Sequence, residues 1–250
     1  MIQTLSSSRT TMSGSRIVGP ALVYLGLLGF MITIWMALIE APSMGDDWNA
    51  PESYRILFVH VPFAWVSFSG FALLFGGSLS WYVKRSERGW RFAIIGAQLG
   101  LLYSLGVLIS GPIWGAAEWG VPWDFQDIRL NSFAVLAGVA LFFALGEMNS
   151  EDTPQKRDSL SSVGIFGFGL VPLTYMATRW WQERHPGPLI GGGNEDSGVD
   201  PSILLIWMIG AASMQILFVG QALMTNRLLK TEQQLENLLA NLEDSIRMTC

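Results

Sequence analysis

Charged residues are scarce in this chain, and their scarcity limits the classes of protein to which it can belong. Only 14% of its 250 residues are charged, whereas half are hydrophobic. A soluble domain usually carries about 25% charged residues. The formal net charge of −5 also argues against binding to nucleic acid, which requires a basic surface. The composition therefore predicts an integral membrane protein.

Cysteine and histidine are rarer still. The single cysteine is Cys250, and the two histidines are His60 and His185. One cysteine cannot form an internal disulfide, and without a CxxC or CxxCH motif we expect neither thiol redox chemistry nor covalent attachment of c-type haem to this chain. There is no Walker A motif, no HExxH and no nucleophile–base pair, so we expect a subunit that is not an enzyme.

Six long uncharged runs account for the apolar half of the chain. They are residues 17–39, 61–83, 92–117, 130–146, 159–178 and 201–226. A helix needs about 20 apolar residues to cross the hydrocarbon core, and the fourth run, although shorter, is within the tolerated range. The first run is too long for the core of a signal peptide, so we expect it to be retained. The sequence predicts an all-α polytopic membrane protein with six transmembrane helices.

The distribution of basic residues predicts the orientation of these helices. Eleven lysines and arginines fall on the side of the two termini, and four fall on the other side. By the positive-inside rule, both termini are then cytoplasmic. The connections 40–60, 113–130 and 179–200 face outward, and both histidines lie on that outer face.

Three regions follow from this topology. Residues 1–15 are rich in serine and threonine, and we expect them to be a disordered cytoplasmic segment. Residues 16–226 form the membrane domain, where the Gly96–Gly100 pair predicts close packing of helices. Residues 227–250 predict a cytoplasmic amphipathic helix for a partner, for self-packing or for no specific partner. Its apolar residues at helical spacing are Leu235, Leu238, Leu239, Leu242 and Ile246.

The outward connection 113–130 is unusually aromatic. The segment WGAAEWGVPWDFQDIRLN, residues 114–131, contains three tryptophans and a phenylalanine. Tryptophan is common at any membrane interface, so a single one predicts little. Three within ten residues, in a segment that also has Gly and Pro, favour a flat apolar platform at the outer surface.

The two histidines suggest what the platform binds. Imidazole is the commonest metal ligand, and two imidazoles on one face can bind a haem iron from opposite sides. Aromatic rings can line the porphyrin, and an arginine can meet a propionate. The residues alone therefore predict an outer-face site for a flat apolar ligand such as haem. A haem-free scaffold subunit with an interfacial belt of tryptophans is the alternative.

Three segments resemble the CcmC family of haem-handling proteins in cytochrome c maturation, known for its tryptophan-rich WWD domain. They are YRILFVHVPFAW (54–65), SGPIWGAAEWGVPWDFQDIRLNS (110–132) and RWWQERH (179–185). The resemblance covers about residues 17–226. It implies binding of haem b at the periplasmic face of the cytoplasmic (inner) membrane and delivery to the haem chaperone CcmE. It also implies an ABC-type complex with CcmA, CcmB and CcmD, which would supply any ATP hydrolysis.

The resemblance assigns roles to individual residues. His60 and His185 become the axial haem ligands, and Arg55 and Arg184 become possible propionate partners. The haem platform becomes Trp114, Gly115, Trp119, Gly120, Trp123, Phe125, Asp127 and Arg129.

The chain departs from the family pattern at two points. Phe125 stands where the signature has a tryptophan, and one extra residue precedes Arg129. Either Asp127 is the signature aspartate, with Gln126 inserted, or Asp124 is, with a shifted loop. The preserved Asp-x-Arg-Leu order favours Asp127.

Two other haem proteins are rivals to a delivery protein. A cytochrome b-type electron carrier usually takes its histidines from within helices, often four for two haems. A haem lyase of the same family is typically longer and has more spans and further histidines. Two histidines at the outer connections of a short chain favour delivery over both.

Overall fold

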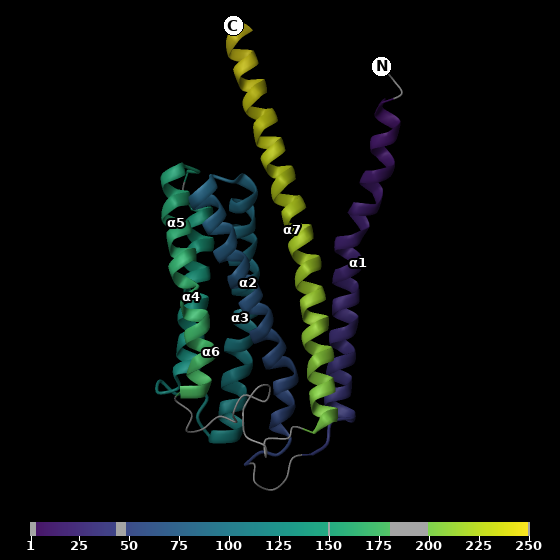
Figure 1. The fold of residues 1–250 in the computed structure, drawn as a ribbon, viewed down its shortest axis with the longest axis vertical. Helices are drawn as coiled ribbons and strands as arrows, with labels where there is room; N and C mark the ends of the chain where they lie inside the picture. Colours follow the sequence, from purple (N-terminus) through teal and green to yellow (C-terminus); the bar gives the residue numbers. More distant parts are fainter. Residues whose placement is uncertain (1–3, 44–48, 150, 181–199, 250) are drawn as a thin grey trace.

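The structure is a computed structural model that describes residues 4–43, 49–149, 151–180 and 200–249, and all the regular structure in these ranges is helical (Figure 1). The elements are α1 (Thr4–Ile39), the short 3-10 helix η1 (Ser53–Ile56), α2 (Leu57–Lys84), α3 (Glu87–Trp119), α4 (Ile128–Met148), α5 (Pro154–Gly167), α6 (Leu170–Trp180) and α7 (Pro201–Thr249).

The prediction of six membrane-crossing segments is confirmed. Six helical stretches in the described part of the chain are long and apolar enough to cross a bilayer, and they coincide with the six predicted runs. The stretches are Ile17–Ile39, Ser53–Lys84, Glu87–Trp119, Ile128–Met148, Pro154–Met176 and Pro201–Arg247. The fifth stretch consists of α5 and α6, which meet at Phe168 and Gly169.

The helices run up and down, so that the connections alternate between the two ends of the bundle. The start of α1 and the end of α7 lie at one end, as the distribution of basic residues requires (Figure 1). The end of α3, the start of α4, the end of α6 and the starts of α2 and α7 lie at the other end, which we call the loop end. The assignment of the loop end to the outer face stays a prediction.

Helices that approach closely do so at glycines. A Cβ atom on Gly96 of α3 would lie 2.2 Å from the backbone nitrogen of Leu74 on α2. On the other side of the molecule, a Cβ on Gly26 of α1 would lie 2.6 Å from the backbone nitrogen of Leu217 on α7. Because only glycine permits these backbone contacts, the close packing predicted for the Gly96–Gly100 pair is confirmed.

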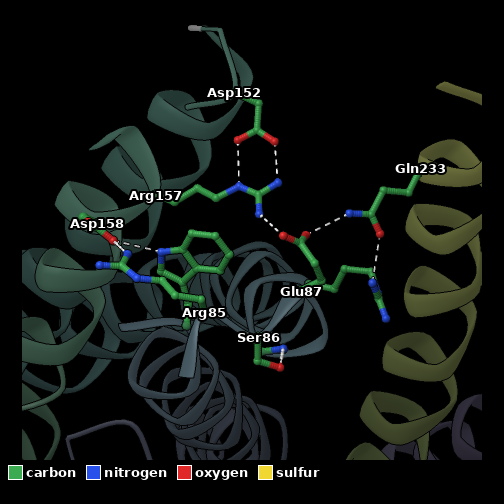
Figure 2. A network of polar contacts seen from close by, with 10 residues as sticks. Arg85, Ser86, Glu87, Asp152, Arg157, Asp158 and Gln233 are labelled. Carbon is green, nitrogen blue, oxygen red and sulfur yellow. Dashed lines mark hydrogen bonds and ion pairs between the residues drawn. The ribbon is translucent and has the colours of Figure 1, made fainter. Parts of the chain in front are cut away.

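A polar network holds the helices together at the end opposite to the loop end (Figure 2). Arg157 of α5 donates to Glu87 of α3 across 2.7 Å and to both carboxylate oxygens of Asp152. Gln233 of α7 donates to Glu87 across 3.0 Å and accepts from Arg91 across 2.9 Å. The network therefore joins α5 to α3, and α3 to α7.

The structure differs from the predicted boundaries at both ends of the chain. The segment from Thr4 onward, predicted to be disordered, continues α1, because extending an existing helix costs little even for serine and threonine. The segment from residue 227 is helical to Thr249, but it continues α7 without a break because it contains neither glycine nor proline.

Two boundaries at the loop end also differ from the prediction. The helix α3 runs to Trp119 and α4 begins at Ile128, so the connection predicted at 113–130 is shorter and spans residues 120–127. The helix α2 begins at Leu57, directly after η1, so His60, predicted at the end of the connection 40–60, lies inside this helix.

Candidate functional site

His60 lies in α2 near its start, at the loop end of the bundle. Its Nδ1 atom is 2.8 Å from the Ser110 hydroxyl oxygen on α3. A Cβ atom on Gly111 would lie 3.4 Å from both His60 Cε1 and Leu130 Cδ1, so the imidazole, α3 and the start of α4 meet at Gly111. The fold thus places His60 where three helices converge.

The signature residues Asp127 and Arg129 lie beside this histidine. Asp127 caps α4, because its Oδ1 accepts the backbone N–H groups of Arg129 at 2.9 Å and Leu130 at 3.3 Å. The Arg129 Nε atom is 3.8 Å from the same oxygen. Leu130, which follows Arg129, shares the Gly111 contact with the His60 imidazole. The preserved Asp-x-Arg order therefore starts a helix and brings a cation close to His60.

Asn131 fastens the connection 120–127, a role that sequence reasoning missed. Its side-chain amide donates to the carbonyls of Asp124 at 3.1 Å and Asp127 at 2.7 Å, and its carbonyl oxygen accepts the Trp123 indole N–H at 3.3 Å. Asp124 itself accepts the backbone N–H of Gln126 at 2.8 Å. The two candidate aspartates thus have different structural roles: Asp127 caps α4, and Asp124 forms a turn.

The four aromatic side chains predicted as one platform differ in exposure. Trp114 is only 2% exposed and packs in a core cluster between α1, α2 and α7. Trp119 is half-buried, with its ring centroid 4.9 Å from that of Trp114. Trp123 is half-buried beside Phe125, which is 87% exposed. Trp114 thus lies on the inner side of α3, whereas Phe125 is exposed, and the platform itself stays a prediction.

The two signature glycines make the turn that ends α3. Gly120 has φ +70°, which glycine adopts without strain, and it caps the helix by donating to the Gly115 carbonyl. Val121 donates to the same carbonyl across 3.3 Å. A Cβ on Gly115 would lie 2.9 Å from the Val121 carbonyl oxygen, so the returning chain needs glycine there as well. Both glycines thus shape the turn that follows α3.

Glu118 is a buried carboxylate whose role sequence reasoning also missed. Its carboxylate accepts the backbone N–H groups of Asn49 and Ala50, each at 3.1 Å, and the Ser53 hydroxyl at 3.4 Å. Its own backbone carbonyl accepts the Asn49 side chain at 2.8 Å. Glu118 therefore ties the segment before η1 to the end of α3. In the sequence, the only sign of this role is a charged residue between Trp114 and Trp119.

Arg55 is occupied by contacts within the protein. Its Nε donates to Glu52 across 2.5 Å, and its Nη1 donates to the Ala37 carbonyl of α1. Hydrogen bonds from Ser43 and Arg55 hold the pKa of Glu52 below its ordinary value. Arg55 thus joins η1 to α1. In its predicted role as a propionate partner, Arg55 would donate through the guanidinium N–H groups that do not bond Glu52 or Ala37.

His185 and Arg184 lie outside the described residues. The structure does place the helix that leads to them: α6 ends at Trp180, at the loop end (Figure 1). Thr174 of α6 donates across 2.9 Å to Ser132 of α4, one turn after Arg129. The chain therefore enters the segment that holds His185 from the same end of the bundle as His60.

The described residues fit a large aromatic ligand better than a bare metal ion. No cluster of three or more histidine, cysteine, aspartate or glutamate side chains occurs in the described part of the chain. His60 offers one imidazole, Arg129 a cation, and Trp119, Trp123 and Phe125 apolar surface. An iron porphyrin uses all three features.

Comparison with known proteins places the similarity across the membrane domain. The family model CcmC, described as "Heme exporter protein C", matches residues 1–240. A heme exporter protein C from Bradyrhizobium diazoefficiens is 27% identical over 207 residues, which cover 80% of this chain and 76% of that protein. One from Rhodobacter capsulatus is 28% identical over 181 residues, 69% of this chain and 71% of that protein. A ccmC-like mitochondrial protein of cytochrome c biosynthesis from Marchantia polymorpha is 28% identical over 167 residues, 66% of this chain and 69% of that protein.

Proposed function

Because the chain belongs to the CcmC family, we propose that it binds haem b at the loop end of its helical bundle and delivers it to a haem chaperone. Family membership supports a multi-pass membrane protein with a role in haem handling for cytochrome c maturation. The observation that carries the proposal is the position of His60. The imidazole lies near the start of α2, where Ser110 and Gly111 of α3 and Leu130 of α4 meet it, and Leu130 directly follows Arg129.

In this proposal His60 and His185 would hold the haem iron. His60 comes from the start of α2, and His185 follows α6, whose end is also at the loop end. When bound, haem supplies the iron that accepts the two imidazoles and the vinyl groups at which it is later attached. The protein supplies position, orientation and tuning of the iron.

The connection 120–127 and its flanks would hold the porphyrin. Trp119, Trp123 and Phe125 expose apolar surface toward solvent, while Trp114 supports them from the core. Arg129 directly precedes Leu130, which shares the Gly111 contact with His60, so we take it as the first choice for a propionate, with Arg55 and Arg184 as further candidates.

The recipient and the partners follow from the family. We propose CcmE as the chaperone, and CcmA, CcmB and CcmD as the other members of an ABC-type complex in the inner membrane. The site would face the periplasm. The highly exposed Phe125 leaves one edge of the platform accessible, as transfer to a second protein requires.

The test is the visible spectrum of protein purified from haem-replete cells. We expect the bands of low-spin, bis-histidine haem, and we expect His60→Gly and His185→Gly to lose them. Added imidazole should restore the low-spin spectrum of each glycine variant, because free imidazole can replace a missing ligand but cannot repair a misfolded helix. A wild-type spectrum in either variant, or haem-free protein whose variants still support cytochrome c maturation, would refute the proposal.

A transfer assay separates delivery from the lyase alternative. Haem-loaded protein mixed with purified CcmE should yield haem bound covalently to CcmE. Covalent transfer directly to an apocytochrome, without CcmE, would instead indicate a lyase.

A further inference from the structure

We propose that Ser110 is a positioning residue: it holds the proton of His60 on Nδ1 and so reserves Nε2 for the haem iron. The identity of the metal rests on the function proposed above. The position of the proton does not, because it follows from hydrogen bonds between α2 and α3.

The hydrogen bonds of Ser110 determine its role. A serine hydroxyl has one hydrogen to donate and lone pairs with which to accept. Ser110 Oγ lies 2.6 Å from the Gly106 carbonyl oxygen of its own helix, which has no hydrogen and can only accept. The hydroxyl therefore donates its hydrogen to the Gly106 carbonyl, a common arrangement for serine within a helix. Toward His60 Nδ1, 2.8 Å away, it can then only accept.

An acceptor at this position requires His60 Nδ1 to carry the hydrogen. A neutral imidazole with its proton on Nδ1 has its lone pair on Nε2, which becomes the nitrogen available to a metal. Ser110 is only 6% exposed, so its hydroxyl is largely removed from competing water. Histidines that bind metals usually donate their second N–H to such an acceptor, which orients the ring and makes it more basic.

The packing of α2 against α3 sets the register that brings the two side chains together. One turn deeper in the bundle, Phe63 of α2 lies against Gly106 of α3, where a Cβ would be 2.2 Å from the Phe63 ring. Phe63 is three residues after His60, and Gly106 is four residues before Ser110. The Phe63–Gly106 contact and the His60–Ser110 hydrogen bond therefore lie one helical turn apart in the same interface between α2 and α3.

The first test needs no haem. The chain has two histidines, so a His185→Ala variant labelled with ¹⁵N-histidine reports His60 alone. In the haem-free protein at pH 8, we expect ¹⁵N shifts of a neutral ring protonated on Nδ1. Ser110→Ala removes the acceptor and should shift population to the Nε2–H form, whereas Ser110→Thr should preserve the Nδ1–H form.

Ser104→Ala is the matched control. Ser104 lies on the same helix, is buried, and donates to the Gly100 carbonyl across 2.7 Å. Ser104→Ala therefore removes the same kind of side-chain-to-backbone hydrogen bond from α3 as Ser110→Ala does. We expect the His60 signal to be unchanged in this variant. A wild-type His60 protonated on Nε2, or a proton position that Ser110→Ala leaves unchanged, would overturn the inference even if the protein binds haem.

The second test uses the haem-loaded protein. Ser110→Ala should bind haem about 10-fold more weakly, and its midpoint potential should rise because a less basic imidazole stabilises ferric iron less. Ser104→Ala should match the wild type, and Ser110→Thr should recover its potential. Equal potentials for the two alanine variants would overturn the inference. Protein that binds no haem would overturn the proposed function, and the proton position would then be decided by the first test alone.

Discussion

Individual residues at the loop end divide into those to which the family resemblance assigns a role in the proposed site and those whose hydrogen bonds only the structure reveals. His60, Trp119 and Phe125 belong to the first kind. Ser110, Glu118 and Asn131 belong to the second kind. Their partners lie on other turns or other helices, as with Glu118 and Asn49, which are 69 positions apart. No local pattern records such a pairing.

Glu118→Ala should release the segment before η1. The change removes the acceptor of the Asn49 and Ala50 backbone N–H groups and leaves both without their partner, at a cost of about 1–3 kcal/mol. Amide hydrogen exchange of residues 49–53 should accelerate accordingly. Glu236→Ala, at an exposed position on α7, is the control and should leave that exchange unchanged. Unchanged protection in Glu118→Ala would mean that the segment is held by other contacts.

The helices as elements were predictable in number and span but not in their ends. Long uncharged runs identify membrane-crossing helices because the bilayer demands internal hydrogen bonding over a set length. Where a helix stops depends on its cap. The turn at Gly120 ends α3 after Trp119 and Asp127 begins α4, so the aromatic residues divide between a helix and a short connection. The predicted outer loop was therefore too long.

At the level of packed helices, Arg157→Lys should destabilise the end of the bundle opposite to the site. Arg157 is only 11% exposed, and its guanidinium lies 4.6 Å from the Trp81 ring centroid and 5.3 Å from that of Trp90. Lysine keeps the charge but loses the planar fork that serves Asp152 and Glu87. We expect a loss of about 1–3 kcal/mol in detergent unfolding.

Two further measurements check the explanation for Arg157. Arg88→Lys, an exposed arginine above Phe92, should have a much smaller effect. Hydrogen bonds from Arg157 lower the pKa of Asp152, so this contact stabilises the fold above the ordinary aspartate pKa and is lost as the pH falls through the lowered value. Arg157→Lys should weaken that acid sensitivity. Equal unfolding energies for the two lysine variants would contradict the proposed network.

At the scale of the whole molecule, the orientation in the membrane can be tested with a single thiol. Cys250 is the only cysteine in the sequence, and it is the residue after Thr249, with which α7 ends. This end of α7 lies at the same end of the bundle as the start of α1. A membrane-impermeant maleimide should label it in inverted vesicles but not in intact spheroplasts. Phe125→Cys in a Cys250→Ser background should show the opposite pattern, since Phe125 is exposed at the loop end. Labelling of both thiols from one side would contradict the predicted topology.

The sequence by itself determined the class of this protein, its six spans, the shared side of its termini and its tryptophan-rich signature. These properties depend on composition and local spacing, because the bilayer constrains the length and polarity of each membrane-crossing helix. Only the tertiary structure decided that Trp114 lies in the core, that Asp127 caps α4 beside His60, and that Ser110 meets the imidazole. Each depends on the rotation and register of helices that are distant in sequence, which are set by glycine contacts such as that of Gly106 with Phe63.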